Sequence, residues 1–342
     1  MFESPCCFAI LNLMKNRDET IRPLLNLRAD RSHGWDGRTR GQAPHKPFLL
    51  LSILDGIEQG WITDNRVEIS QELIDTFFTY WNAVMDHDQI TTIALPFYHM
   101  KSEPFWELEY NTGEKEYKSS PSLGGLKDRV AYAVIDPGLY SLMKDNAGRE
   151  KIRNLLAGHY FSEETTYRLM EIGSMNFQAW RYSDEIVSMV AEPFVAYRTD
   201  KNKRKLVERY AQVREAGFTT TVRKSYDHNC AVCRDRLVTP GGRTLVEGAH
   251  IIPWSMSNND DPRNGMSLCR SHHWMFDNMM LTIREDFTIR TSYWMERNGN
   301  SVEETVKLKN REILVPDDTR FQPSVEAILH HNERFEEFHS NN

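Results

Sequence analysis

The sequence predicts an α+β protein with two domains. We expect a mostly helical N-terminal domain with a small β part (residues 1–165), a basic helical linker (166–215), a C-terminal domain built from a β-hairpin and a helix (216–315), and a C-terminal tail (316–342). The length predicts the division, because 342 residues exceed the roughly 250–300 at which a single core usually stops growing. Two patterns predict what each domain contains. Apolar residues recur at helical spacing in the first half, and cysteines and histidines gather late in the chain.

The composition excludes several classes of protein. Hydrophobic residues make up 40% and charged residues 27%, which suits packed cores and excludes a disordered or fibrous chain. The longest apolar stretches, residues 8–14 and 48–54, are far shorter than the roughly 20 residues of a membrane span. No signal-peptide pattern opens the chain, so we expect a cytoplasmic protein. The net charge of -7 indicates no polyanionic partner, so nucleic-acid binding would depend on local basic patches.

Helical spacing defines the N-terminal domain. Residues 47–57 keep apolar side chains on one helical face, and Pro47 suits a first helical turn. Ser70 is a candidate N-cap for a second helix. Its apolar residues recur at three- and four-residue spacing: Leu73, Ile74, Phe77, Phe78 and Trp81.

The rest of the N-terminal half mixes helices with an aromatic segment. Residues 139–161 form a further helical tract, and another helix is expected to begin near Ser162. Residues 93–108 are rich in aromatic side chains and contain Pro96 and Pro104. That composition predicts short strands or turns rather than a helix.

Two segments are strongly basic. The first, residues 15–46, has eight basic residues against four acidic ones. The basic residues are Lys15, Arg17, Arg22, Arg28, Arg31, Arg38, Arg40 and Lys46. The second, residues 198–214, has seven basic residues (Arg198, Lys201, Lys203, Arg204, Lys205, Arg209 and Arg214) against two acidic ones. Both are suited to contact phosphates, but a solvated surface loop and a solvated linker helix explain the same patterns.

The cysteines predict a metal site. The five cysteines are Cys6, Cys7, Cys230, Cys233 and Cys269. An odd and uneven set argues against a disulfide framework and favours a metal site in a reducing compartment. Cys230 and Cys233 form a C-x2-C pair, and Cys269 and His272 form a C-x2-H pair. Two such pairs complete a tetrahedral zinc site with no open position, which would stabilise the fold rather than do chemistry.

Two polar residues, His250 and Asn264, lie within the segment that the four ligands bracket, and a third, His273, directly follows the last ligand. Residues 244–252 predict a strand and residues 268–280 a helix. This order, with the motifs A-H-I-I-P, N-G, H-H and F-D over residues 220–290, resembles the HNH nuclease motif, a ββα-metal fold. The resemblance implies that His250 is a general base, Asn264 holds its loop, and His273 is a ligand of a catalytic Mg²⁺ or Mn²⁺ ion.

One position departs from that family. Many HNH enzymes have an acidic metal ligand immediately before the base, where this chain has Ala249. Glu247 lies on the same strand face as Ala249, and Asp277 lies one turn after His273. Either could supply the missing oxygen ligand, with Asp277 ranked first. Each could equally be a solvated surface carboxylate.

A second resemblance covers residues 10–165. The segments GRTRGQAPHKPFLLL, EPFWEL and VAYAVIDPGLY look like the sulfur-binding domain of phosphorothioation-dependent restriction endonucleases, which pair it with an HNH nuclease. The resemblance implies that the N-terminal domain reads DNA whose backbone carries sulfur in place of a phosphate oxygen. The matching residues are Arg38, His45, Lys46, Pro104 and Phe105. Glu103 stands where some relatives have tyrosine.

Together the two resemblances imply a type IV-like restriction endonuclease that defends against modified foreign DNA. It would bind phosphorothioated double-stranded DNA and hydrolyse it by a one-metal HNH mechanism. Two cuts are needed for a double-strand break, so we expect a homodimer or transient pairing on DNA. Two alternatives remain open: an HNH restriction enzyme that reads methylated cytosine, and a non-cleaving zinc module that binds DNA.

Overall fold

The computed structural model describes residues 19–340 except residue 33 and residues 87–88, 115, 117–118, 199–207 and 296–306. The described residues form two compact units. The N-terminal unit runs to Phe177 and includes Pro240–Arg243, and the C-terminal unit comprises Gln178–Thr239 and the chain from Thr244 onward. Cys6, Cys7, Lys15, Arg17 and the centre of the second basic segment lie outside the described residues.

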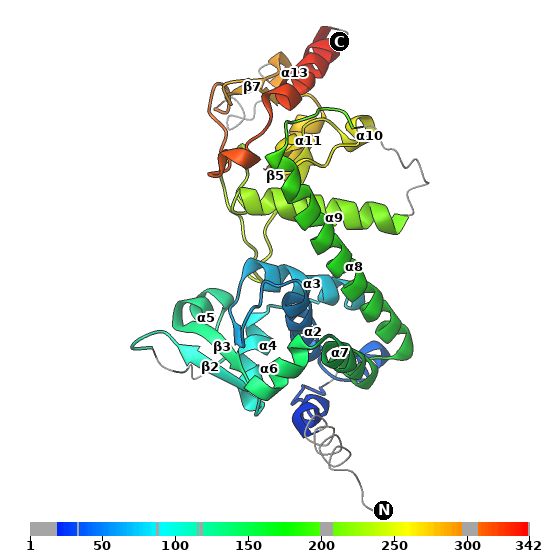
Figure 1. The fold of residues 1–342 in the computed structure, drawn as a ribbon. Coiled ribbons are helices and arrows are strands. Elements are labelled where there is room, and N and C mark those ends of the chain that lie inside the picture. Colours follow the sequence, from blue (N-terminus) through cyan, green and yellow to red (C-terminus); the bar gives the residue numbers. More distant parts are fainter. Residues whose placement is uncertain are drawn as a thin grey trace, which may run out of the picture. The chain divides into compact units, whose positions relative to one another are not determined.

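The N-terminal unit is mostly helical, with one small sheet (Figure 1). Its helices are α2 (His45–Glu58), α3 (Gln71–Val84), α4 (Ala94–His99), α5 (Leu123–Arg129), α6 (Pro137–Lys144), α7 (Asn146–Tyr160) and the first part of α8 (Glu163–Ser188). Strands β1 (Arg66–Val67), β2 (Trp106–Tyr110) and β3 (Val130–Ile135) pair antiparallel in the order β1-β3-β2. The central helix α2 is buried from Lys46 to Gly56 and packs against α3, α4, α6 and α7.

Local sequence signals place several of these helices where they were expected. Helix α2 confirms the helix predicted over residues 47–57. Ser70 caps α3, because its hydroxyl accepts a hydrogen bond from the Leu73 amide at 3.1 Å. Ser162 does the same for α8 through the Thr165 amide at 3.2 Å. The tract at residues 139–161 is two helices, because Asp145 ends α6 and caps α7.

The prediction for residues 93–108 was wrong in its first half. Residues Ala94–His99 form helix α4, and a short 3-10 helix (Met100–Ser102) follows it. Pro96 is accommodated because it lies in the first turn of α4, where its missing N–H has no intrahelical partner to lose. Only the second half of the segment is extended, as β2.

A buried polar cluster fixes four helices of the N-terminal unit to one another. Arg153 on α7 lies with Nη1 2.5 Å from Asp55 Oδ1 on α2. Tyr80 on α3 and Asn176 on α8 each donate a hydrogen bond to Asp55 Oδ2, both at 2.8 Å. Removing one partner of such a buried ion pair typically costs about 3–5 kcal/mol, because the other charge is left uncompensated.

The C-terminal unit is built on a hairpin between two helices. Strands β4 (Val246–His250) and β5 (Gly265–Cys269) pair antiparallel, with Val246 opposite Cys269 and His250 opposite Gly265. Helix α9 (Glu208–Ser225) packs against both strands, and α11 (Arg270–Asp277) follows β5 directly. The remaining elements are the end of α8, α10 (Trp254–Ser257), β6 (Leu281–Ile283), β7 (Ile289–Thr291) and α13 (Val325–Ser340).

The helix predicted over residues 268–280 is shorter than expected, since Leu268 and Cys269 belong to β5. The C-terminal segment is a docked helix: α13 packs against β6 and buries His331 and Phe335. The His331 ring stacks on Phe276 of α11 with centroids 3.7 Å apart. Burial lowers the pKa of His331 to about 3, so this ring is neutral and acts as a packing group.

The remaining 3-10 helices are short, at Arg22–Leu25, Gly37–Thr39, Met189–Ala191, Pro262–Asn264, Tyr293–Met295 and Thr319–Phe321. The predicted α+β fold class is confirmed: a mostly helical N-terminal part with a small sheet, and a C-terminal hairpin and helix. Among the described residues, none of the helices combines the length and the apolar character that a membrane span needs.

We predict that Gly265→Ala destabilises the C-terminal unit by about 1–3 kcal/mol, because the added methyl group overpacks the contact between β5 and α9. Its Cβ would lie 2.6 Å from Val222 Cγ2 and 2.9 Å from Phe218 Cζ. Denaturant unfolding checks the change. Gly158→Ala is the control, because Gly158 lies on the exposed face of α7 and its added Cβ would have no neighbour from outside the helix backbone within 4 Å. This variant should be as stable as the wild type or more stable. Equal stability of both variants and the wild type would contradict the tight packing.

Candidate active site and metal centre

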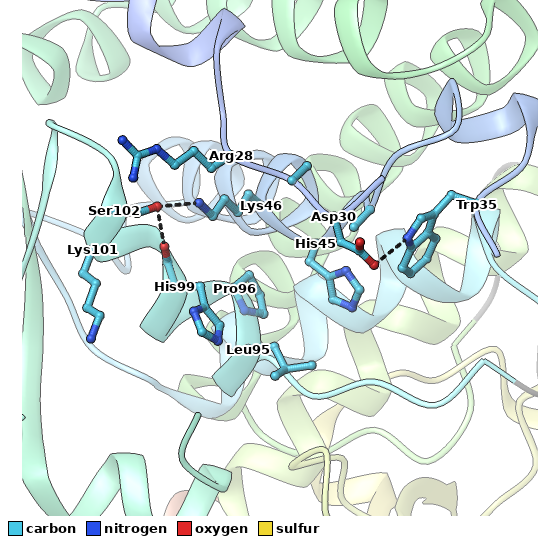
Figure 2. Close-up of a pocket in the computed structure, with 12 residues that line it drawn as sticks. Arg28, Asp30, Trp35, His45, Lys46, Leu95, Pro96, His99, Lys101 and Ser102 are labelled. Atoms are coloured by element: carbon cyan, nitrogen blue, oxygen red, sulfur yellow. Dashed lines mark hydrogen bonds between the residues drawn. The ribbon is translucent and has the colours of Figure 1, made fainter. Parts of the chain in front are cut away.

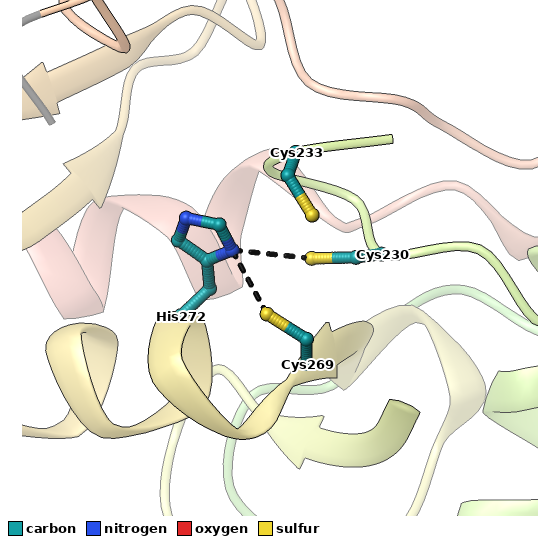
Figure 3. Close-up of side chains that lie close together, drawn as sticks. All are labelled: Cys230, Cys233, Cys269 and His272. Carbon is teal, nitrogen blue, oxygen red and sulfur yellow. Dashed lines mark hydrogen bonds between the residues drawn. The ribbon is translucent and has the colours of Figure 1, made fainter. Parts of the chain in front are cut away.

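Three cysteines and one histidine converge in the C-terminal unit (Figure 3). The ligand atoms of Cys230, Cys233, Cys269 and His272 all lie within 4.8 Å of one another. Cys230 and Cys233 come from the turn after α9, Cys269 from the end of β5 and His272 from the first turn of α11. His272 Nδ1 lies 3.1 Å from Cys269 Sγ and 3.5 Å from Cys230 Sγ.

The donor set fits a structural zinc ion. All three cysteines are free thiols, and three sulfurs with one imidazole nitrogen make up a complete tetrahedral Cys₃His site. Burial lowers the pKa of His272, but its hydrogen bonds to Cys230 and Cys269 outweigh this and raise it to about 9. In the region that the structure describes, this is the one group of three or more Cys, His, Asp or Glu side chains gathered so closely.

A second group of polar side chains surrounds His273, on the helix that carries His272. His273 Nδ1 lies 3.3 Å from Glu247 Oε2 on β4, and His273 Nε2 lies 3.4 Å from Asp277 Oδ2 one turn along α11. The structure thus brings both carboxylates that the sequence suggested to the same histidine. The two carboxylates offer oxygen ligands of the kind that Mg²⁺ and Mn²⁺ prefer. Arg270 also contacts Glu247, with Nε 3.2 Å from Oε1.

Asn264 holds the segment that follows β4. Its side chain is fully buried and donates from Nδ2 to the carbonyl oxygens of Ile252 and Asn259, both at 3.0 Å. Its Oδ1 accepts from the Ile252 amide at 2.9 Å. These bonds close the loop between β4 and β5 immediately after His250.

His250 lies against α9 at the end of β4. Its ring stacks on Phe218 with centroids 3.7 Å apart and an angle of 7° between the planes. Its Nε2 lies 2.8 Å from Oδ1 of Asp260, a buried residue of the loop. Sequence reasoning missed Asp260, and the only signal for it was the run of Asn and Asp residues at 258–261. Among the described contacts, none joins His250 directly to His273.

The N-terminal unit contains a pocket of about 420 Å³ beside the start of α2 (Figure 2). His45 and Lys46 line it together with Trp35, Leu95 and Pro96. The His45 ring lies 5.4 Å from the Trp35 ring and 4.7 Å from the ring of Trp81. Burial lowers the pKa of His45 to about 4, so it is neutral at neutral pH.

Charge in this pocket is largely compensated. Lys46 forms a buried ion pair with Glu103 and a 3.0 Å hydrogen bond to Ser102 Oγ. Burial lowers the pKa of Lys46, although Glu103 opposes the shift. Glu103 also accepts a hydrogen bond from the Arg28 amide at 3.0 Å. The exposed Arg28 side chain lines the same pocket.

The structure does not gather all five residues assigned to the sulfur site. Pro104 and Phe105 line a separate hollow of about 330 Å³, and Arg38 forms ion pairs of 2.7 Å with Asp36 and Asp86. Only His45 and Lys46 of the five line the 420 Å³ pocket. Pro96 lies there instead. The aromatic segment at residues 93–108 holds two Pro-Phe pairs, at residues 96–97 and 104–105, and the sequence-based assignment used the second.

The comparison with family models decides the nature of the C-terminal unit, because residues 230–284 match the model described as HNH endonuclease. The C-terminal unit carries an HNH endonuclease domain. The matched segment of the HNH domain contains all four Cys₃His residues and also His250, Asn264 and His273. The predicted nuclease assignment is therefore confirmed.

The other comparisons add little to the assignment of the HNH domain. A solved structure described as "Modification dependent TagI restriction endonuclease" matches at 25% identity with a TM-score of 0.28. The match covers 36% of this chain and 38% of that one. No curated protein matches the chain.

We predict that the purified protein holds one zinc ion per chain and that Cys269→Ser loses it. The HNH domain should then unfold, because metal-binding free energy in such sites is largely folding free energy. Elemental analysis and thermal unfolding measure the two effects. Cys6→Ser and Cys7→Ser should keep the zinc, and a Cys269→Ser protein that retained both metal and fold would contradict the assignment.

Proposed function

We propose that the protein is a modification-dependent restriction endonuclease whose N-terminal unit binds phosphorothioated DNA and whose HNH domain cleaves it. The observation that carries the nuclease part is the HNH match over residues 230–284, with His273 lying between Glu247 and Asp277. We further propose that it restricts foreign DNA and that two copies pair on the duplex to cut both strands.

Each polar side chain of the HNH domain has a role in this proposal. His250 takes a proton from water as that water attacks the phosphorus atom. Asn264 keeps the loop beside His250 in place through its three hydrogen bonds. His273, with Asp277 or Glu247, would hold one Mg²⁺ or Mn²⁺ ion. Such an ion, when bound, offsets the charge that develops on the phosphoryl and leaving oxygens.

The properties of the 420 Å³ pocket support the sulfur-reading part. Its lining combines Pro96, Leu95 and Trp35 with a His45 ring that is neutral at neutral pH. Sulfur is larger and more weakly hydrated than oxygen, so placing it against ring and aliphatic carbons costs less than burying an oxyanion there. Arg28 is placed to meet the backbone charge, because it lines the pocket and its side chain is exposed.

A second candidate function uses the same pocket for a methylated cytosine. The rings of Trp35 and His45 offer aromatic surfaces of the kind on which a flipped base stacks. The non-cleaving alternative is disfavoured by the HNH match.

We predict that His250→Ala and His273→Ala each lower the cleavage rate about 10²–10⁴-fold, because the first removes the base and the second a metal ligand. DNA affinity should stay close to that of the wild type. Single-turnover cleavage and a binding assay on the same duplex separate the two effects. His330→Ala on α13 is the matched control and should cleave normally. Normal cleavage by His250→Ala would rule out its role as base.

We predict that Pro96→Leu weakens binding to a phosphorothioated duplex at least about tenfold, because the larger side chain fills the pocket that receives sulfur. Pro104→Leu should bind normally, since Pro104 is exposed and lines a different hollow. Titration of each variant with sulfur-containing and sulfur-free duplexes measures the preference. The opposite ranking of the two variants would restore the original assignment of Pro104.

A further inference from the structure

We propose that Asp260 is a positioning residue for the HNH reaction: it holds the Nε2–H tautomer of His250, so that Nδ1 receives the proton from water. The inference rests on the proposed function, in which His250 is the base. It adds a residue that the motif does not contain and specifies which ring nitrogen reacts.

The carboxylate of Asp260 is buried, and three side chains converge on it. It is 3% exposed. Oδ1 lies 2.8 Å from His250 Nε2 and 2.5 Å from Arg214 Nη1 on α9. Oδ2 accepts a 2.6 Å hydrogen bond from the hydroxyl group of Tyr182 on α8. A loop carboxylate is thereby anchored from two helices.

These contacts keep Asp260 ionised. Burial alone would raise its pKa, but the hydrogen bonds with His250 and Tyr182 and the positive charge of Arg214 lower it below the ordinary value. An ionised carboxylate has no proton to donate. Since Asp260 can only accept, the proton in the His250–Asp260 hydrogen bond belongs to Nε2.

The Nδ1 edge of the His250 ring is available to accept a proton. Phe218 stacks on the imidazole face, so tilting the ring would break the stacking, and a half-turn of the ring would break the bond to Asp260. For Nδ1 of His250, no hydrogen-bond partner is present among the described residues. Nδ1 carries the lone pair in this tautomer and takes the proton of water as its oxygen bonds to phosphorus. The imidazolium that results is stabilised by the charge of Asp260.

The groups around Asp260 are themselves fixed, so they hold its carboxylate in one position. The Arg214 guanidinium lies over the Trp254 ring, 4.2 Å from its centroid, which fixes its direction. Burial raises the pKa of Tyr182, so its hydroxyl stays protonated and donates. The backbone next to Asp260 is fixed as well, because Asn264 donates to the carbonyl of Asn259.

The test begins with a spectrum that does not depend on activity. Protein labelled with ¹⁵N-histidine is examined by long-range ¹H–¹⁵N NMR, and the His250 signals are identified as those that His250→Ala loses. We expect a proton on Nε2 and none on Nδ1. In the neutral wild-type ring, a proton on Nδ1 and none on Nε2 would overturn the proposal, whether or not the protein cleaves DNA.

The second arm measures single-turnover cleavage and DNA affinity for Asp260→Asn. We expect a rate lower by about 10²–10⁴-fold with affinity within about threefold, together with a changed His250 tautomer signal. Tyr182→Phe, which keeps the carboxylate, should show a smaller loss in the same direction. Asp261→Asn is the matched control, because Asp261 is buried next to Asp260 but bonds to Arg263 and not to His250. It should cleave within about threefold of the wild type.

The outcomes separate this inference from the proposed function. A wild type that cleaves no DNA would remove the nuclease proposal, while the NMR spectrum would still decide the tautomer. A wild type that cleaves, a His250→Ala variant that does not, and an Asp260→Asn variant with normal rate and tautomer would keep the nuclease and overturn the role of Asp260.

Discussion

The convergence of Cys230, Cys233, Cys269 and His272 is the constraint on which the rest of the HNH domain depends. It brings together three short segments: the turn after α9, the end of β5 and the first turn of α11. Because His272 turns toward the cysteines, the next residue of the helix, His273, faces Glu247 on β4. Two adjacent histidines therefore have different surroundings: His272 belongs to the Cys₃His group, and His273 lies between two carboxylates and, in the proposed mechanism, binds the catalytic ion.

The two units handle charge differently, and the difference suits their proposed tasks. In the N-terminal pocket His45 is neutral and Lys46 is matched by Glu103, so the interior favours a soft, weakly hydrated atom over a strongly hydrated anion. In the HNH domain a carboxylate is kept ionised in a buried position by Arg214 and Tyr182, where it can stabilise a charge that forms only during reaction. In the proposed function, the first arrangement selects the ligand, and the second orients His250 and stabilises its charge during the reaction.

The sequence predicted what depends on short spacing. C-x2-C, C-x2-H and the order of His250, Asn264 and His273 indicated the HNH domain, and capping at Ser70 and Ser162 marked helix starts. It did not predict what depends on the tertiary fold. Asp260 lies beside His250 only because the hydrogen bonds of Asn264 close the loop after β4, and Pro96 and His45 line one pocket only because α4 packs against α2. Proline in the first turn of α4 also hid that helix, since the same residue is a strand and turn signal elsewhere.

The most direct test of the account compares three pools of DNA duplexes that share the same randomised flanking sequences. The first pool is unmodified, the second carries one phosphorothioate and the third carries 5-methylcytosine. Wild-type protein is incubated with each pool in Mg²⁺ or Mn²⁺, and both bound and cleaved DNA are sequenced. The account predicts binding and cleavage that depend on sulfur. Equal cleavage of the unmodified pool, or cleavage confined to the methylated pool, would contradict it.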